Sequence, residues 1–150
     1  MADLRDLYQE VILDHSRRPQ NYRVIDGATR KAEGFNPLCG DRVTVYLDFA
    51  DGRVRDVSFQ GQGCSISKAS ASMMTSAVKG KTKAEAEQLF QRFHEMVTGR
   101  SAEPFDPKAL GKLAVFSGIS EFPTRVKCAS LAWHTLRAAL DQKDGTVSLE

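Results

Sequence analysis

The chain contains a regularly alternating stretch, Val43-Thr-Val-Tyr-Leu-Asp-Phe49, in which apolar side chains occupy every second position. This period of two predicts a β-strand that buries one face. The dipeptide Asp51-Gly52 follows closely and is typical of the tight turn in a β-hairpin. A looser alternation over residues 53–60 predicts the returning strand. We therefore expect a small antiparallel sheet of about three strands, with a polar edge strand within residues 23–36.

Helical patterns flank these strands on both sides. Residues 3–18 carry apolar side chains at the three- and four-residue spacing of a helix, which Pro19 ends. Thr82 and Glu85 have the spacing of a capping box at the start of another helix. The further expected elements are helices over residues 65–78, 83–97, 108–116 and 122–140 and a loop over residues 99–107. This order predicts the α+β class, with a small sheet packed against helices.

The length and composition fit one globular domain over residues 1–150, with residues 141–150 as a flexible tail. A net charge of +2, with the basic residues scattered, argues against nucleic-acid binding. The apolar runs are too short to cross a membrane, and the first residues lack the apolar core of a secretion signal. We therefore expect a cytoplasmic protein whose thiols stay reduced.

Three cysteines on distant segments carry the chemistry that the sequence suggests: Cys39, Cys64 and Cys128. An odd number of cysteines cannot all pair within one chain. Asp41 stands two residues after Cys39, so three thiolates and one carboxylate are available for a tetrahedral metal such as zinc. Cys64 lies at a predicted helix N-terminus, where free N–H groups stabilise a thiolate. Arg125 and Lys127 precede Cys128, and we expect these cations to favour its thiolate as well.

Each of these residues also has a plainer interpretation. A free cysteine such as Cys64 can be a small buried hydrophobic residue, and Asp41 after Gly40 can be a turn residue. The three histidines lie on predicted helices, where a surface or interface position is more common than a ligand role: His15, His94 and His134. The sequence contains no C-x-x-C motif, so a thioredoxin-type redox site is excluded.

The order and spacing of several motifs resemble the IscU/NifU-like proteins of iron–sulfur cluster assembly, over roughly residues 4–140. The motifs are Leu13-Asp14-His15 with Pro19 and Asn21, Asn36-Pro37-Leu38-Cys39-Gly40-Asp41, Gly61-Gln62-Gly63-Cys64-Ser65-Ile66-Ser67, and Phe122-Pro123 with Arg125-Val126-Lys127-Cys128. In two features the chain resembles the SufU branch of that family. Lys127 stands where the scaffold branch usually has a histidine, and residues 99–116 fit a branch-specific insertion.

This resemblance implies a site and a partner. Proteins of the SufU branch bind zinc through the residues that match Cys39, Asp41, Cys64 and Cys128. They accept persulfide sulfur from a SufS-type cysteine desulfurase, with the residue matching Cys39 as the acceptor. The residue matching Arg125 lies at the interface with the desulfurase, and a histidine of that enzyme takes the place of the acceptor on zinc. Sulfur then passes to downstream assembly proteins.

Three functions remain open from the sequence. The first is a zinc-dependent sulfur carrier, which is sulfurtransferase-like rather than a classical enzyme and works as a monomer. The second is a scaffold that assembles a [2Fe–2S] cluster on the same three cysteines and transfers it to acceptors. The third is a purely structural zinc domain, against which the carboxylate ligand and the glycine-flanked Cys39 both argue.

Overall fold

The computed structural model describes residues 4–99, 111–141 and 146–148. Within them the helices are α1 (Leu4–Arg17), α2 (Ser65–Val78), α3 (Lys83–Thr98), the 3-10 helix η1 (Gly111–Glu121) and α5 (Pro123–Leu140). The strands are β1 (Arg30–Asn36), β2 (Asp41–Ala50), β3 (Arg53–Gln62) and β4 (Thr146–Ser148). None of the helices in these residues is long and apolar enough to cross a membrane.

The sheet has the order β3-β2-β1-β4, and its first three strands are antiparallel as predicted. Asp51 and Gly52 form the β2–β3 turn with φ values of 56° and 73°, the left-handed backbone that this tight turn requires. The prediction of a flexible tail over residues 141–150 is wrong in part, because Thr146–Ser148 form β4, which pairs in parallel with β1. The edge of β1 offers unpaired backbone groups, and this short segment satisfies some of them.

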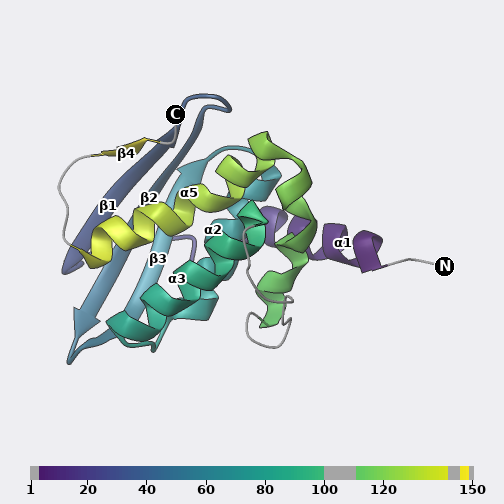
Figure 1. Cartoon of the computed structure of the whole chain (residues 1–150). Helices are drawn as coiled ribbons and strands as arrows, with labels where there is room; N and C mark the ends of the chain where they lie inside the picture. Colours follow the sequence, from purple (N-terminus) through teal and green to yellow (C-terminus); the bar gives the residue numbers. More distant parts are fainter. Residues whose placement is uncertain (1–3, 100–110, 142–145, 149–150) are drawn as a thin grey trace.

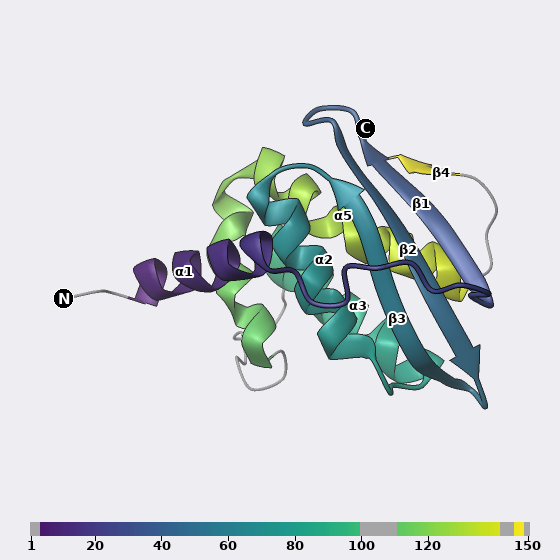
Figure 2. The same ribbon diagram turned by 180° about the vertical axis from the view of Figure 1, so that it is seen from behind.

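Helices α2 and α5 pack on one face of the sheet, and α3 packs against α5 on the same side (Figure 1). The opposite view shows the segment between α1 and β1 running across the other face (Figure 2). The strand side chains Val45, Leu47 and Val57 are fully buried, and Leu131 and Trp133 of α5 are buried in the same core cluster. Helix α1 lies beside α2 at one end of the molecule (Figures 1 and 2). This packing therefore fixes the N-terminal ends of α2 and α5, which carry Cys64 and Cys128, relative to the sheet.

The helix boundaries largely follow the predicted signals. Thr82 and Glu85 form the capping box at the start of α3, with both reciprocal hydrogen bonds present. The expected helix over 108–116 differs: from Gly111 onward the chain forms a 3-10 helix that reaches Glu121. Residues 108–110 and nearly all of the expected loop lie outside the described residues, as does Asp3, the expected cap of the first helix. The proposed insertion over 99–116 therefore stays a prediction.

An aromatic cluster between α3 and α5 predicts acid sensitivity. The rings of His94 and His134 meet edge to face at 5.5 Å, and Phe90 packs against both. Burial, followed by the nearby His94 and Arg137, lowers the pKa of His134 to about 4. Because the unfolded state binds this proton near pH 6.5 and the folded state does not, stability falls as pH drops from 6.5 to 4. We expect a loss of roughly 2 kcal/mol, since partial exposure reduces the full linkage.

The measurement is urea denaturation of the wild type and of His134→Phe between pH 7.5 and 4.5. The slope of unfolding free energy against pH should be shallower in His134→Phe, while other titrating groups contribute equally to both proteins. Equal slopes would contradict the assignment of this effect to His134.

Candidate metal centre

The four predicted ligand residues lie where the ends of separate elements meet. Cys39 occupies the turn between β1 and β2, and Asp41 is the first residue of β2. Cys64 is the N-cap of α2, directly after β3, and Cys128 lies near the start of α5. The β1–β2 turn, the β3–α2 connection and the start of α5 lie at the same end of the molecule (Figure 1). The topology thus brings together residues 89 positions apart in the chain, as the Cys39–Cys128 contact shows.

The donor atoms are close enough to share one ion. Donor atoms of Cys39, Asp41 and Cys128 all lie within 4.8 Å of one another, and the sulfurs of Cys39 and Cys128 are 3.4 Å apart. The Cys64 sulfur lies 3.9 Å from Oδ2 of Asp41. The thiol of Cys128 also influences Cys64, whose pKa it lowers. Three of the four predicted ligands thus form one group, and Cys64 lies outside that group but beside Asp41.

Asp41 is a buried carboxylate that the backbone holds in place. It has no exposed surface, so the turn-residue interpretation is wrong for this position. Its Oδ1 accepts a hydrogen bond from the N–H of Cys64 at 2.9 Å, which leaves Oδ2 facing the Cys64 sulfur. A Cβ atom at Gly63 would lie 2.3 Å from this Oδ1. Glycine at position 63 is therefore what permits the carboxylate to approach the start of α2.

Asn36 is a supporting residue to which sequence reasoning gave no role. Its side chain is fully buried at the end of β1, and its Oδ1 accepts from the N–H of Leu38 in the Cys39 turn. Its Nδ2 donates to the Cys128 sulfur at 4.0 Å, a long contact. One amide thus links the turn that carries Cys39 to the helix that carries Cys128. The only signal in the sequence was an asparagine at the end of the expected edge strand. A polar side chain that is buried at such a position needs hydrogen-bond partners.

The three thiols have different environments. Cys39 and Cys64 are exposed and Cys128 is buried, so the buried-hydrophobe interpretation does not hold for Cys64. The hydrogen bond from the Cys128 thiol, with a further one from the Ser67 N–H, lowers the pKa of Cys64 to about 6. The same thiol contact, together with burial, raises the pKa of Cys128. The N–H groups at the helix start thus contribute to the lowered pKa of Cys64, as expected, but the Cys128 thiol contributes most.

The expected effect of the neighbouring cations on Cys128 is wrong, because burial and the adjacent sulfurs dominate there. Arg125 is exposed, and its guanidinium lies 4.7 Å from the ring centroid of Phe122. Among the described residues, its side chain forms no hydrogen bond or ion pair with the four predicted ligands. The structure therefore places Arg125 on the surface near the start of α5 rather than inside the cluster.

The donor set fits zinc by its chemistry and its spacing. Zinc prefers thiolate, imidazole and carboxylate ligands in a tetrahedron, and zinc–sulfur bonds of about 2.3 Å place two sulfurs about 3.8 Å apart. The sulfurs of Cys39 and Cys128, 3.4 Å apart, are near that separation. Three thiolates beside a buried carboxylate would repel one another strongly without a cation. Cys39, Asp41, Cys64 and Cys128 could thus hold one zinc ion.

Comparisons with known proteins match this architecture along most of the chain. The family model described as "NifU-like N terminal domain" matches residues 7–142. The chain is 41% identical to "Iron-sulfur cluster assembly scaffold protein IscU" of Streptococcus pyogenes serotype M1, over 93% of this chain and 86% of that protein. It is 39% identical to "Zinc-dependent sulfurtransferase SufU" of Bacillus subtilis (strain 168), over 96% of both chains.

A solved structure shows the same fold. The crystal structure described as a putative iron-sulfur cluster assembly scaffold protein for the SUF system, from Fervidobacterium islandicum AW-1, matches with a TM-score of 0.82. It is 38% identical and covers 92% of this chain and 99% of its own. The predicted arrangement of a three-strand antiparallel sheet against helices is thereby confirmed as that of IscU- and SufU-like proteins.

Proposed function

This chain belongs to the family of NifU-like N-terminal domains, with IscU- and SufU-like relatives in iron–sulfur cluster assembly, and we propose that it is a zinc-dependent sulfur carrier. It would accept sulfur from a cysteine desulfurase of the SufS type and deliver it to cluster assembly proteins in the cytoplasm. The observation that carries this proposal is the unequal exposure of the clustered thiols: Cys39 is open to a partner and Cys128 is buried.

The proposed reaction is a thiol–persulfide exchange. The thiolate of Cys39 attacks the terminal sulfur of the persulfide on the desulfurase. A new S–S bond forms at Cys39 while the S–S bond of the donor breaks, and the donor cysteine leaves as a thiolate. The sulfane sulfur moves without net oxidation or reduction, so the step needs no external oxidant. Bound zinc would hold the thiolates deprotonated until the partner arrives.

Several features support Cys39 as the acceptor. It lies in an exposed turn, followed by Gly40 with φ of 71°, and a turn can rearrange more easily than a helix. The other two sulfurs accept hydrogen bonds from N–H groups: Cys64 from Ser67 at 3.5 Å, and Cys128 from Asn36. Such bonds withdraw charge from a thiolate and reduce its nucleophilicity. Among the described residues, the sulfur of Cys39 receives no N–H bond of this kind.

We further propose that the desulfurase docks over this end of the molecule, with this chain as a monomer. Leu38, beside Cys39, is 63% exposed, and Phe122 is 47% exposed under the guanidinium of Arg125. These two exposed apolar side chains offer apolar surface that a docked partner would bury. Arg125 would contact the partner there, and a histidine of the partner would replace Cys39 in the ligand set.

The competing function is assembly of a [2Fe–2S] cluster on Cys39, Cys64 and Cys128. The Streptococcus relative is named as a scaffold, which favours this function, and the Bacillus relative is named as a sulfurtransferase, which favours the carrier. Lys127 favours the carrier as well, because the scaffold branch usually has histidine at that position.

The test is the elemental composition and visible spectrum of the protein purified without oxygen. The carrier predicts about one zinc per chain with neither iron nor colour, because one tetrahedral set of donors is present. It also predicts that the zinc-loaded protein accelerates a SufS-type desulfurase. Iron with acid-labile sulfide and charge-transfer bands, in a form that transfers intact to an apo-acceptor, would replace the carrier by the scaffold.

A further inference from the structure

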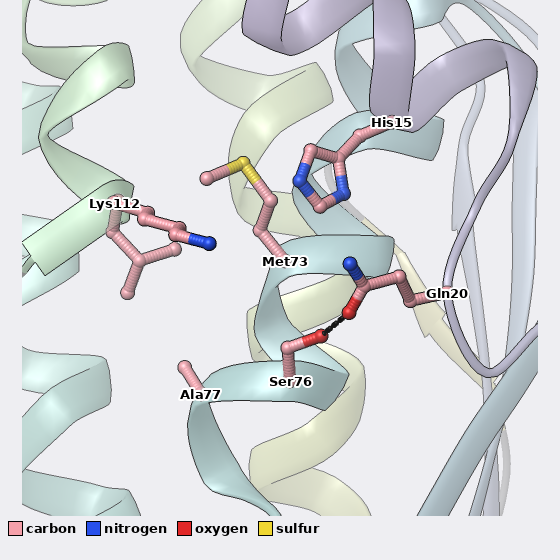
Figure 3. A pocket seen from close by; sticks show the side chains of 7 residues that line it. His15, Gln20, Met73, Ser76, Ala77 and Lys112 are labelled. Atoms are coloured by element: carbon pink, nitrogen blue, oxygen red, sulfur yellow. Dashed lines mark hydrogen bonds between the residues drawn. The ribbon is translucent and has the colours of Figure 1, made fainter.

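A cavity lies between α1, α2 and η1, and its lining contains no residue of the metal centre. Its volume is about 320 Å³, near the lower end of the range for pockets that bind small ligands. His15 and Gln20 line it from α1 and the segment that follows, and Lys112 lines it from η1 (Figure 3). The remaining lining residues are Met73, Ser76, Ala77 and Leu113.

The imidazole of His15 presents a hydrogen-bond donor here. Ser72 Oγ accepts a hydrogen bond from the backbone N–H of Gln20 at 2.8 Å and lies 2.8 Å from Nδ1 of His15. The Ser72 hydroxyl, which accepts from the Gln20 N–H, donates to Nδ1 of His15 in the tautomer that keeps the ring hydrogen on Nε2. A neutral ring that accepts at Nδ1 carries its hydrogen on Nε2. Nε2 of His15 has no protein partner among the described residues, so it is available to a ligand.

The other polar groups of the cavity are donors as well. Oε1 of Gln20 accepts from the Ser76 hydroxyl, as the dashed line in Figure 3 shows, which leaves the amide nitrogen of Gln20 free. This nitrogen points toward the ring of His15, while the ammonium of Lys112 reaches from the opposite side toward Met73 (Figure 3). In the part of the chain that the structure describes, Lys112 has no ion pair and no carboxylate lines the cavity.

The electrostatic field at His15 is positive. Burial and then the charge of Lys112 lower the pKa of His15, and Asp14 opposes them more weakly. Two free N–H donors, a cationic amine and no competing carboxylate favour an anion. The side chains of Met73, Ala77 and Leu113 supply an apolar wall beside these groups.

We propose that this cavity binds a small organic anion with a short apolar tail, of the short-chain carboxylate class. The anionic group lies between Lys112, His15 and Gln20, and the tail packs on Met73, Ala77 and Leu113. This site also gives the Leu13-Asp14-His15 motif a role, because its histidine supplies one of the donors. It is independent of the sulfur carrier proposal, since none of its residues belongs to the metal centre.

The test is an NMR titration of the zinc-loaded, isotope-labelled full chain at pH 7. The signals followed are the His15 ring and the Ala77 methyl group, and the probes are hexanoate, 1-hexanol, acetate and inorganic phosphate. We expect hexanoate to shift both signals saturably and to bind at least about tenfold more tightly than 1-hexanol, because only hexanoate offers a charge-assisted acceptor. Acetate and phosphate should bind more weakly than hexanoate, because they lack the tail.

Lys112→Gln should weaken hexanoate binding about tenfold through loss of one charge-assisted contact. The matched control is Lys81→Gln, which removes an exposed lysine outside the cavity lining and should leave the binding unchanged. Hexanoate should also raise the pKa of His15 in the wild type, because a bound anion stabilises the imidazolium. Equal binding of hexanoate and 1-hexanol, equal binding of hexanoate and phosphate, or undiminished hexanoate binding by Lys112→Gln would overturn the proposal.

Discussion

Replacement of Cys39 by alanine is expected to abolish sulfur acceptance while the fold survives. The substitution removes the proposed nucleophile, and loss of a nucleophile generally lowers a reaction rate by far more than a hundredfold. Because Cys39 is exposed in a turn, its truncation leaves no cavity in the core, and the unfolding free energy of the metal-free protein should change by less than about 1 kcal/mol. The measurement is mass spectrometry of the persulfide on this chain after incubation with a SufS-type desulfurase, pyridoxal phosphate and cysteine.

Two further variants separate chemistry from metal binding. Cys39→Ser has nearly the same size but a far weaker nucleophile, and it should be as inactive as Cys39→Ala. Cys128→Ala removes a buried member of the cluster and should lower zinc content and stability together. Persulfide formation at the wild-type rate in Cys39→Ala would assign the acceptor role to another cysteine and refute the mechanism proposed above.

Local sequence signals predicted most of the fold because the physics there is local. The alternation over residues 43–49 lies within β2, and the capping box of Thr82 and Glu85 starts α3 at the predicted residue. The predictions that were wrong concern segments whose structure depends on tertiary contacts. Thr146–Ser148 are too few to show a period, and they become a strand only because the edge of β1 lies beside them. Residues 111–121 contain two glycines and form a 3-10 helix, whose apolar side chains are buried by neighbouring elements.

The site shows the same division. The ligand types and their places at a turn and at helix starts were predictable from the sequence, whereas the contacts that orient them were not. Asn36 pairs with Asp41 across the β1–β2 ladder, and this register places the asparagine amide near Cys128. In the sequence, Gly63 is only one member of the motif that contains Cys64. Its importance depends on the distance to a carboxylate 22 residues earlier in the chain, which no sequence spacing reveals.

Gly63→Ala is expected to weaken zinc binding about 10- to 100-fold, the usual effect of disturbing groups that orient metal ligands. The added Cβ would lie 2.3 Å from Oδ1 and 2.9 Å from Cγ of Asp41, so the carboxylate must move. That movement breaks the hydrogen bond from the Cys64 N–H and turns Oδ2 away from the sulfurs. The measurement is competition for zinc against a chromophoric chelator, with circular dichroism as the check on folding.

Gly118→Ala is the matched control, because a Cβ at that glycine meets no atom within 4 Å and its backbone has no positive φ. It should bind zinc as tightly as the wild type. A second variant, Asp41→Asn, keeps the shape of the carboxylate but removes its charge, and it should weaken zinc binding to a similar degree. If Gly63→Ala bound zinc within twofold of the wild type, the Asp41 carboxylate would not be held for the metal by this contact. Reduced affinity in Gly63→Ala and Asp41→Asn with normal affinity in Gly118→Ala would instead support Asp41 as a ligand whose position depends on the absence of a side chain at residue 63.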